Sequence, residues 1–279
     1  MKTNFWMSIA NIWAEYGPSF LRGAGMTMLI AVISTAIGCL IGFGVGIVQT
    51  IPADRREQPV RWWIMRVVRF VLGAYVEIFR GTPMMVQAMF IFYGMAMLWN
   101  IHLAMLPAAL LIVSINTGAY MAETVRGGIL SIDCGQTEGA KAIGMTHVQT
   151  MLSVVLPQAL RNIMPQIGNN FIINVKDTSV MFIIGFNDFF AVHKAVAGAT
   201  FRFFPSAAIE MAGYLTMTLL ASFLLRRLEK LLDGHASYEL VREDPLVATA
   251  GTYNYPGKGS PYDEVNRERP QGARKEDAE

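Results

Sequence analysis

The sequence predicts an all-α integral membrane protein with about five membrane-spanning helices, and three observations lead to this fold class. First, 53% of the 279 residues are hydrophobic and only 16% are charged, which is more apolar than soluble domains of this length. Second, several stretches of about 20 residues are nearly free of charge, and that length spans a ~30 Å hydrocarbon core as a helix. Third, Lys and Arg gather at the ends of these stretches, a pattern that sets membrane topology.

The first 18 residues form a distinct amphipathic pattern. Aromatic and aliphatic residues such as Trp6, Ile9 and Trp13 recur at helical spacing beside polar residues. We expect residues 1–18 to lie as a helix in the outer membrane interface. This segment lacks the basic stretch, apolar core and small-residue cleavage site of a secretory signal, so we expect no cleaved targeting peptide.

A membrane domain is predicted for residues 19–232. Its five expected crossings lie near residues 26–48, 82–99, 105–122, 162–186 and 206–225. In the first crossing Gly38, Gly42 and Gly46 recur at every fourth position, a ladder that lets the backbone of another helix approach closely. The fourth crossing differs from the others, because polar and ionisable residues interrupt it.

The distribution of Lys and Arg predicts the orientation. These residues are concentrated after the first and fifth crossings and between the third and fourth, whereas residues 100–104 contain none. Since positively charged loops stay in the cytoplasm, we expect the N-terminus outside and the C-terminus inside. Residues 233–279 are rich in Gly, Pro and mixed charge and are predicted to form a disordered cytoplasmic tail.

The connection between the third and fourth crossings, residues 127–157, contains a short helical pattern where a tight turn would suffice. Loops of this length are usually functional. The small residues Ala140 and Ala142 allow a short helix to approach a partner, and Gly144 permits a sharp turn back to the membrane. The loop is therefore predicted to lie in a groove on a partner and to transmit force.

In this loop the sequence resembles the permease subunits of ATP-binding-cassette importers. That family carries a Glu-Ala-Ala segment, a Gly four residues after the second Ala, and an Ile-x-Leu-Pro ending. The residues at those places are Glu138, Ala140, Gly144, Leu156 and Pro157. Two positions depart from the pattern, since Gly139 replaces the first Ala and Val154 replaces the Ile. The resemblance implies an ATPase-coupling surface made of Gly135, Glu138, Gly139, Ala140, Lys141, Ala142, Gly144, Leu156 and Pro157, and we call residues 127–157 the coupling loop.

Two further stretches are similar to the polar amino acid branch of this family. One runs from Val76 to Pro83 at the entry to the second crossing, and the other is Lys176-Asp177-Thr178-Ser179 in the fourth. Three short motifs in the right order are more specific than any one of them. The resemblance covers residues 17–234 and implies a multi-pass permease in the cytoplasmic (inner) membrane of a prokaryote.

The same resemblance implies the partners. They are a dimer of cytoplasmic ATP-binding-cassette ATPases, a second permease chain, identical or related, an extracytoplasmic amino acid-binding protein and membrane lipid. ATP and Mg are expected on the ATPase, because this chain has no Gly-x-x-x-x-Gly-Lys-Ser/Thr loop. We expect no cofactor in this chain, no enzymatic activity of its own and no nucleic-acid partner.

Polar side chains at membrane depth are costly and are therefore functional candidates. Asn170, Asn174 and Asp177 stand at i, i+4 and i+7 of the fourth crossing, which places them on one helical face. The full set of solute-pathway candidates is Gln87, Asn169, Asn170, Asn174, Lys176, Asp177 and Thr178. A competing interpretation is that these residues seal contacts between helices or permease chains by hydrogen bonds.

A structural role is expected at the entry to the second crossing, for Glu77, Arg80, Gly81 and Pro83. Glu77 and Arg80 are three residues apart and are predicted to pair at the cytoplasmic interface, and Pro83 suits the first turn of a helix. The two Cys and four His residues show no metal-ligand spacing. No nucleophile motif is present either, so we expect neither a metal site nor a catalytic residue.

Three functions are compatible with these patterns. The favoured one is the permease of an ATP-driven importer that forms the translocation pathway for a polar amino acid. A close alternative is the same machine for another small solute, such as a short peptide or an inorganic anion. An ion channel or a secondary carrier subunit belongs to a different class and would need no ATPase-docking helix, so the coupling loop favours the importer.

Overall fold

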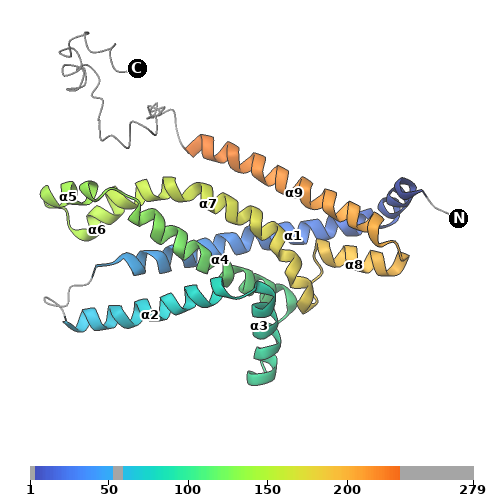
Figure 1. Ribbon diagram of the computed structural model, residues 1–279, viewed down its shortest axis with the longest axis horizontal. Helices are drawn as coiled ribbons and strands as arrows, with labels where there is room; N and C mark the ends of the chain where they lie inside the picture. The colour runs from blue at the N-terminus through green and yellow to red at the C-terminus, as the bar shows by residue number, and fades with distance from the viewer. Residues whose placement is uncertain (1–3, 53–58, 233–279) are drawn as a thin grey trace, which may run out of the picture. The chain divides into compact units, whose positions relative to one another are not determined.

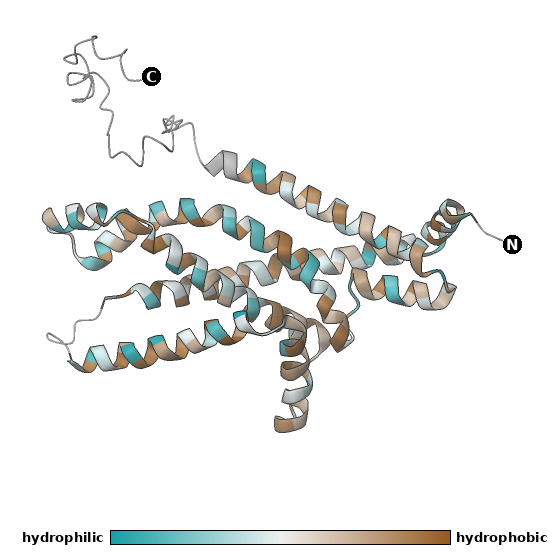
Figure 2. Cartoon of the chain, viewed as in Figure 1, coloured by the Kyte–Doolittle hydropathy of each residue, from teal (hydrophilic) through white to brown (hydrophobic). Residues whose placement is uncertain are grey.

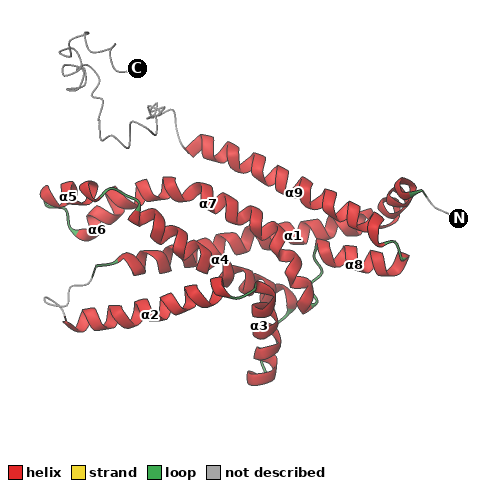
Figure 3. Ribbon diagram, in the orientation of Figure 1, coloured by secondary structure: helices red, strands yellow, loops and turns green. Residues whose placement is uncertain are grey.

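The computed structural model describes residues 4–52 and 59–232, and within these ranges the chain forms helices and no β-strand (Figure 3). The expected tail, residues 233–279, lies outside the described residues. The α-helices are α1 (Phe5–Thr50), α2 (Pro59–Gly81), α3 (Met84–Trp99), α4 (Met105–Leu130), α5 (Cys134–Ala142), α6 (His147–Thr150), α7 (Leu156–Asp177), α8 (Phe189–Thr200) and α9 (Phe203–Leu232). A π-helical turn, η1 (Met151–Val155), precedes α7, and a 3-10 helix, η2 (Thr178–Ile184), follows it.

The length and composition of the helices agree with the predicted membrane protein. Among the described residues, α1, α4 and α9 are each long and apolar enough to cross a membrane. Two bent pairs, α2 with α3 and residues 147–184 with α8, raise the number of spans to as many as five. Hydrophobic residues run along most of these helices (Figure 2). The predicted fold class is therefore confirmed, while the orientation across the membrane stays a prediction.

The first crossing is longer than expected. Residues 5–18 and 26–48 belong to one helix of 46 residues that continues through Pro18, and Figure 1 shows its first turns set at an angle to the rest. A proline removes one helical hydrogen bond and bends a helix without always ending it. At ~1.5 Å per residue α1 is about 70 Å long, so part of it extends beyond the hydrocarbon core. Ile12 and Phe20 are buried, which shows that the N-terminal turns also pack against the rest of the chain.

The second crossing differs from the prediction. The expected segment 82–99 appears as α3, which has only 16 residues and a length of about 24 Å. It leaves the end of α2 at an angle of 112°, whereas the 23-residue α2 lies along α4 and α1. Pro83 adopts extended angles and is the N-cap of α3, so it interrupts the helix at the corner. No crossing was predicted for α2 because it contains several Arg residues, although long Arg stems also cover apolar surface.

The predicted glycine ladder contacts α4. A Cβ atom added to Gly42 would lie 2.3 Å from the Met121 Cβ, and one added to Gly38 would lie 2.6 Å from Thr117. Gly46 faces Val125 in the same way, at 2.8 Å. The backbones of α1 and α4 are therefore closer than any larger residue at these positions would allow.

The fourth crossing begins earlier than expected and continues as a second type of helix. The predicted segment 162–186 corresponds to α7 and η2, which together cover residues 156–184. Gly185, with φ of +82°, ends this unit. The chain then forms α8, which packs on α9 and α1 and begins at Asp188, whose carboxylate accepts a hydrogen bond of 2.8 Å from the Ala191 N–H.

Candidate functional site

The coupling loop contains the short helix that the sequence predicts. The carboxylate of Asp133 caps its start by accepting a hydrogen bond of 2.7 Å from the Gly135 N–H. At its end Gly144 has a φ of +83°. The Gly144 N–H donates to Lys141 O at 2.9 Å and the Met145 N–H donates to Ala140 O at 3.1 Å. This pair of bonds is the Schellman arrangement that ends a helix on a left-handed glycine, so the turn at Gly144 follows from the local sequence.

Helix α5 is also fixed to the segment that leads into α7. The Thr146 hydroxyl and the Gln149 side chain form a reciprocal capping box at the start of α6. The Gln158 side chain donates to Val154 O at 2.8 Å and to the Gln136 Oε1 atom at 3.5 Å. Ala140 is buried beneath the loop. Helix α5 is therefore in contact with the first turn of α7.

Three large apolar side chains on the outer surface of the coupling loop are exposed in this chain. Ile143 is 79% exposed, Val148 63% and Leu152 60%. The remaining predicted coupling residues on α5 and its turn, except buried Ala140, are also exposed: Gly135, Glu138, Gly139, Lys141, Ala142 and Gly144. Exposed apolar groups surrounded by polar ones are typical of a protein-binding surface. In Figure 1, α5 and α6 lie together at the end of α7 that is remote from α8.

Two of the predicted pathway residues are engaged in helix packing. The Asn174 amide, which is 5% exposed, donates to the Thr35 hydroxyl at 2.8 Å and bonds with the Thr117 hydroxyl at 3.0 Å. Gln87 donates to Phe79 O at 2.9 Å, and its carbonyl accepts from Asn116 at 3.0 Å. These bonds join α7 to α1 and α4, and α3 to α2 and α4. Both residues therefore have a structural role, and their contact with solute stays a prediction.

The other pathway candidates are distributed around α7. Asn169 and Lys176 are exposed, Thr178 is buried, and Asn170 and Asp177 are half-buried. Asn170 donates to Gln166 O, one turn earlier in its own helix, at 3.1 Å. The predicted stripe of Asn170, Asn174 and Asp177 is thus interrupted by burial of its middle member, because α1 and α4 cover that position.

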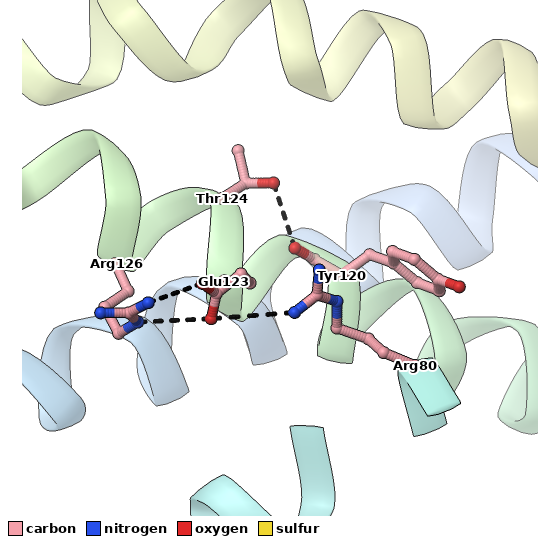
Figure 4. A network of polar contacts seen from close by, with 5 residues as sticks. All are labelled: Arg80, Tyr120, Glu123, Thr124 and Arg126. Carbon is pink, nitrogen blue, oxygen red and sulfur yellow. Dashed lines mark hydrogen bonds and ion pairs between the residues drawn. The ribbon is translucent and has the colours of Figure 1, made fainter. Parts of the chain in front are cut away.

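An ion-pair network lies between α2 and α4 (Figure 4). The Arg80 guanidinium is 3.9 Å from the Glu123 carboxylate and lies over the ring of Tyr120, 5.7 Å from its centroid. Glu123 also pairs with Arg126, one turn along α4, at 2.6 Å. The predicted pairing of Glu77 with Arg80 is therefore wrong. Because α2 packs along α4, the long Arg80 side chain reaches across to the neighbouring helix, while Glu77 stays exposed.

This network was not predicted from the sequence, in which Glu123 and Arg126 only mark the end of the third crossing. The structure extends α4 to Leu130, so Glu123 lies seven residues before the end of that helix. Its side chain and that of Arg80 are 35% and 39% exposed in this chain. Charged groups within a membrane helix rarely face lipid, which indicates that this face turns toward water or protein.

A second cluster of ionisable side chains joins α8 to α9. The His193 Nε2 atom is 3.5 Å from the Glu210 carboxylate, and its Nδ1 atom is 2.9 Å from the Ser206 hydroxyl. His193 is 2% exposed. The sequence shows Glu210 as the only charge of its predicted crossing and His193 as an isolated loop histidine, so their contact depends on α8, which the sequence did not predict.

A family model described as a binding-protein-dependent transport system inner membrane component matches residues 60–235. The chain belongs to this family of membrane transport components. The match extends from α2 through the coupling loop to the end of α9, so it includes every helix that forms the two ionic clusters and the turn at Gly144. It confirms the predicted resemblance and the inner membrane location.

Curated relatives and a solved structure agree with the family. The glutamine transport system permease protein GlnP of Escherichia coli K12 is 36% identical over 220 residues, which cover 78% of this chain and 94% of GlnP. The arginine transport system permease protein ArtQ of Bacillus subtilis 168 is 30% identical over 218 residues, with coverage of 78% and 94%. A crystal structure of an amino acid ABC transporter with histidines matches with a TM-score of 0.70 and 32% identity, covering 82% of this chain and 99% of that one. The helices of this chain therefore have the arrangement of an ABC transporter permease.

Proposed function

We propose that the chain forms the translocation pathway of an ATP-driven importer for a polar amino acid. The observation that carries this proposal is the α5 turn, in which a capped, exposed helix ends on a left-handed Gly144 and is hydrogen-bonded to the start of α7. Such an element can bind a partner and pass a displacement to a membrane helix. An amino acid is the favoured solute because relatives that match most of this chain are named as permeases for glutamine and arginine.

The partner of α5 in this proposal is a dimer of cytoplasmic ATP-binding-cassette ATPases. The exposed Ile143 and Val148 would enter a groove on the ATPase, and Glu138 and Lys141 would contact its rim. ATP and Mg would bind to the ATPase. Hydrolysis on that separate subunit would move α5, and the chain itself would carry out no chemistry.

A second permease chain and an extracytoplasmic solute-binding protein complete the proposed assembly. The half-exposed network of Arg80 and Glu123 supports a second chain, since a charged face at membrane depth requires water or protein beside it. Two copies, identical or related, can enclose a polar cavity that five spans alone are too few to surround. The binding protein would deliver the amino acid to this cavity from outside.

The proposal can be tested by reconstitution with its ATPase and solute-binding protein in proteoliposomes. We expect ATP-dependent uptake of at least one polar amino acid among the twenty radiolabelled L-amino acids, and no uptake with a non-hydrolysable ATP analogue. Solute or ion flux that persists without ATP would favour the channel or carrier instead. The exposed Cys134 also tests the orientation, because a membrane-impermeant maleimide should label it in inverted vesicles but not in intact cells.

A further inference from the structure

A cavity lies where α7, η2, α8 and α9 meet, at the opposite end of α7 from the coupling loop. Its volume is about 450 Å³, and residues lining it include Lys176, Ser179, Phe190, Glu210 and Tyr214. This volume falls in the range of ~300–1,000 Å³ that is common for small-molecule sites. The cavity therefore has space for a small solute within one permease chain.

The two charged side chains of this cavity have opposite signs. Lys176 comes from the last turn of α7 and Glu210 from the second turn of α9. Among the described residues, no ion pair joins Lys176 to Glu210. The two charges therefore do not neutralise each other. Charges are costly at membrane depth, and a ligand that carries both signs would interact favourably with both of them.

The Glu210 carboxylate is supported by a residue that does not line the cavity. His193 lies 3.5 Å from it and is itself 2% exposed, with its ring against that of Phe203 at 5.2 Å. When the Ser206 hydroxyl donates to the Nδ1 atom of His193, at 2.9 Å, the ring proton is on Nε2 and faces Glu210. A neutral histidine orients the carboxylate without supplying a positive charge to it. Such support from outside the site is typical of a preorganised ligand group.

We infer that this cavity binds the zwitterionic head group of the transported amino acid, with Glu210 facing the ammonium group and Lys176 facing the carboxylate. An α-amino acid carries an ammonium group and a carboxylate group on a single carbon, which matches the two opposite charges that line the cavity. The side chain of the solute would lie against Phe190 and Tyr214, which contribute apolar surface. This inference rests on the proposed function and names the feature of the solute that the chain recognises.

The test uses the complete transporter, purified in detergent without its solute-binding protein. Calorimetry would measure binding of L-glutamine, of its deaminated analogue glutaramic acid and of its decarboxylated analogue 4-aminobutanamide. If uptake selects another amino acid, that amino acid and its corresponding analogues take their place. In the wild type, loss of either charged group from the ligand should weaken binding about tenfold, because hydrogen bonds to charged groups are the strong ones.

Charge-removing variants then assign each contact. Glu210→Gln should weaken glutamine binding about tenfold but should bind glutaramic acid as the wild type does, because that ligand lacks the ammonium group. Lys176→Gln should show the converse pattern, with unchanged binding of 4-aminobutanamide. The matched control is Arg161→Gln, since Arg161 is an exposed cation of α7, the helix of Lys176, and does not line the cavity; its binding of all three ligands should equal that of the wild type.

Two results would overturn the inference. One is a wild-type transporter that binds glutaramic acid as tightly as glutamine, which needs no variant and so does not depend on how the variants fold. The other is an assembled Glu210→Gln transporter that discriminates among the three ligands as the wild type does. Failure of the proposed function looks different, because the wild type itself would then show no ATP-dependent uptake of any amino acid.

Discussion

The α1–α4 interface and the coupling loop both depend on glycine, but for opposite physical reasons. At Gly42 the surrounding atoms leave no room, since an added Cβ would lie 2.3 Å from Met121. At Gly144 an added Cβ would meet nothing within 4 Å, but the backbone has a φ of +83°. The first glycine allows two helices to pack, and the second directs the chain. Substitutions at the two sites should therefore fail in different ways.

The largest effect is expected at the packed site. Gly42→Leu should force α1 away from α4 and cost roughly 3 kcal/mol or more, at or above the usual range for overpacking. Thermal unfolding in detergent and the yield of membrane-inserted protein would measure this loss. The control is Gly44→Leu, because an added Cβ at Gly44 of the same helix meets nothing within 4 Å. Equal stability of the two variants would show that α1 and α4 do not pack as described.

At the Gly144 turn, we expect a loss of coupling to the ATPase. A β-branched residue is strained in the left-handed region by about 1–2 kcal/mol, and because the turn is exposed it can relax by changing the direction of the chain. Gly144→Val should therefore give a folded, membrane-inserted protein with little co-purified ATPase and little ATP-dependent uptake. Gly144→Asn is the control, since Asn tolerates left-handed angles, and it should keep most of the uptake. Wild-type transport by Gly144→Val would show that the loop is not the coupling element and would favour a channel or carrier.

A smaller effect should separate packing from the solute pathway on α7. Asn174→Leu leaves the buried hydroxyls of Thr35 and Thr117 without their amide partner and should cost about 1–3 kcal/mol of stability. Asn170→Leu, one turn away, removes a bond within its own helix and a weak contact of 3.4 Å to the Met121 sulfur of α4, so it should reduce uptake with a smaller loss of stability than Asn174→Leu. Melting temperature and initial uptake rate should be measured on both variants. Normal uptake by Asn170→Leu would place the pathway elsewhere.

The smallest effect on stability is expected from the half-exposed network of α2 and α4. Glu123→Gln removes the charge that pairs with Arg80 and Arg126 and should change stability by about 1 kcal/mol or less, as for other exposed ion pairs. Glu77→Gln is the matched control, because Glu77 is exposed, and it should not change stability. A loss of several kcal/mol on Glu123→Gln would mean that a partner buries this network in the assembled transporter.

Features that depend on neighbouring residues could be predicted from the sequence. The short helix of the coupling loop and the turn at Gly144 follow from small residues, a glycine and a proline within some 25 positions. The Asp133 cap is equally local and could have been found by the same reasoning. The glycine ladder also predicted a close helix contact, but not that α4 would form it.

Features that depend on distant residues could not be predicted in this way. Arg80 has a local candidate partner in Glu77, and only the packing of α2 along α4 brings Glu123 closer. Asn174 was predicted as a pathway residue, and only the structure shows that it is also bonded to Thr35 and Thr117. The prediction for the second crossing did not include α2, an arginine-containing helix that turns by 112° into α3. For Arg80 and Asn174 the sequence identified a polar residue and the tertiary structure supplied its partner.

The hydrogen bonds of Asn174 have a mechanical consequence. They join α7 to α1 and α4 near one end of α7, while the Gln136–Gln158 contact joins α7 to α5 at the other. A helix held in this way acts as a lever. Since α7 has 22 residues and is about 33 Å long, a tilt of about 10° would displace one end by roughly 6 Å relative to the other. Because Asn174 lies three residues before the end of α7, such a tilt would move the end beside the coupling loop far more than the end beside Lys176.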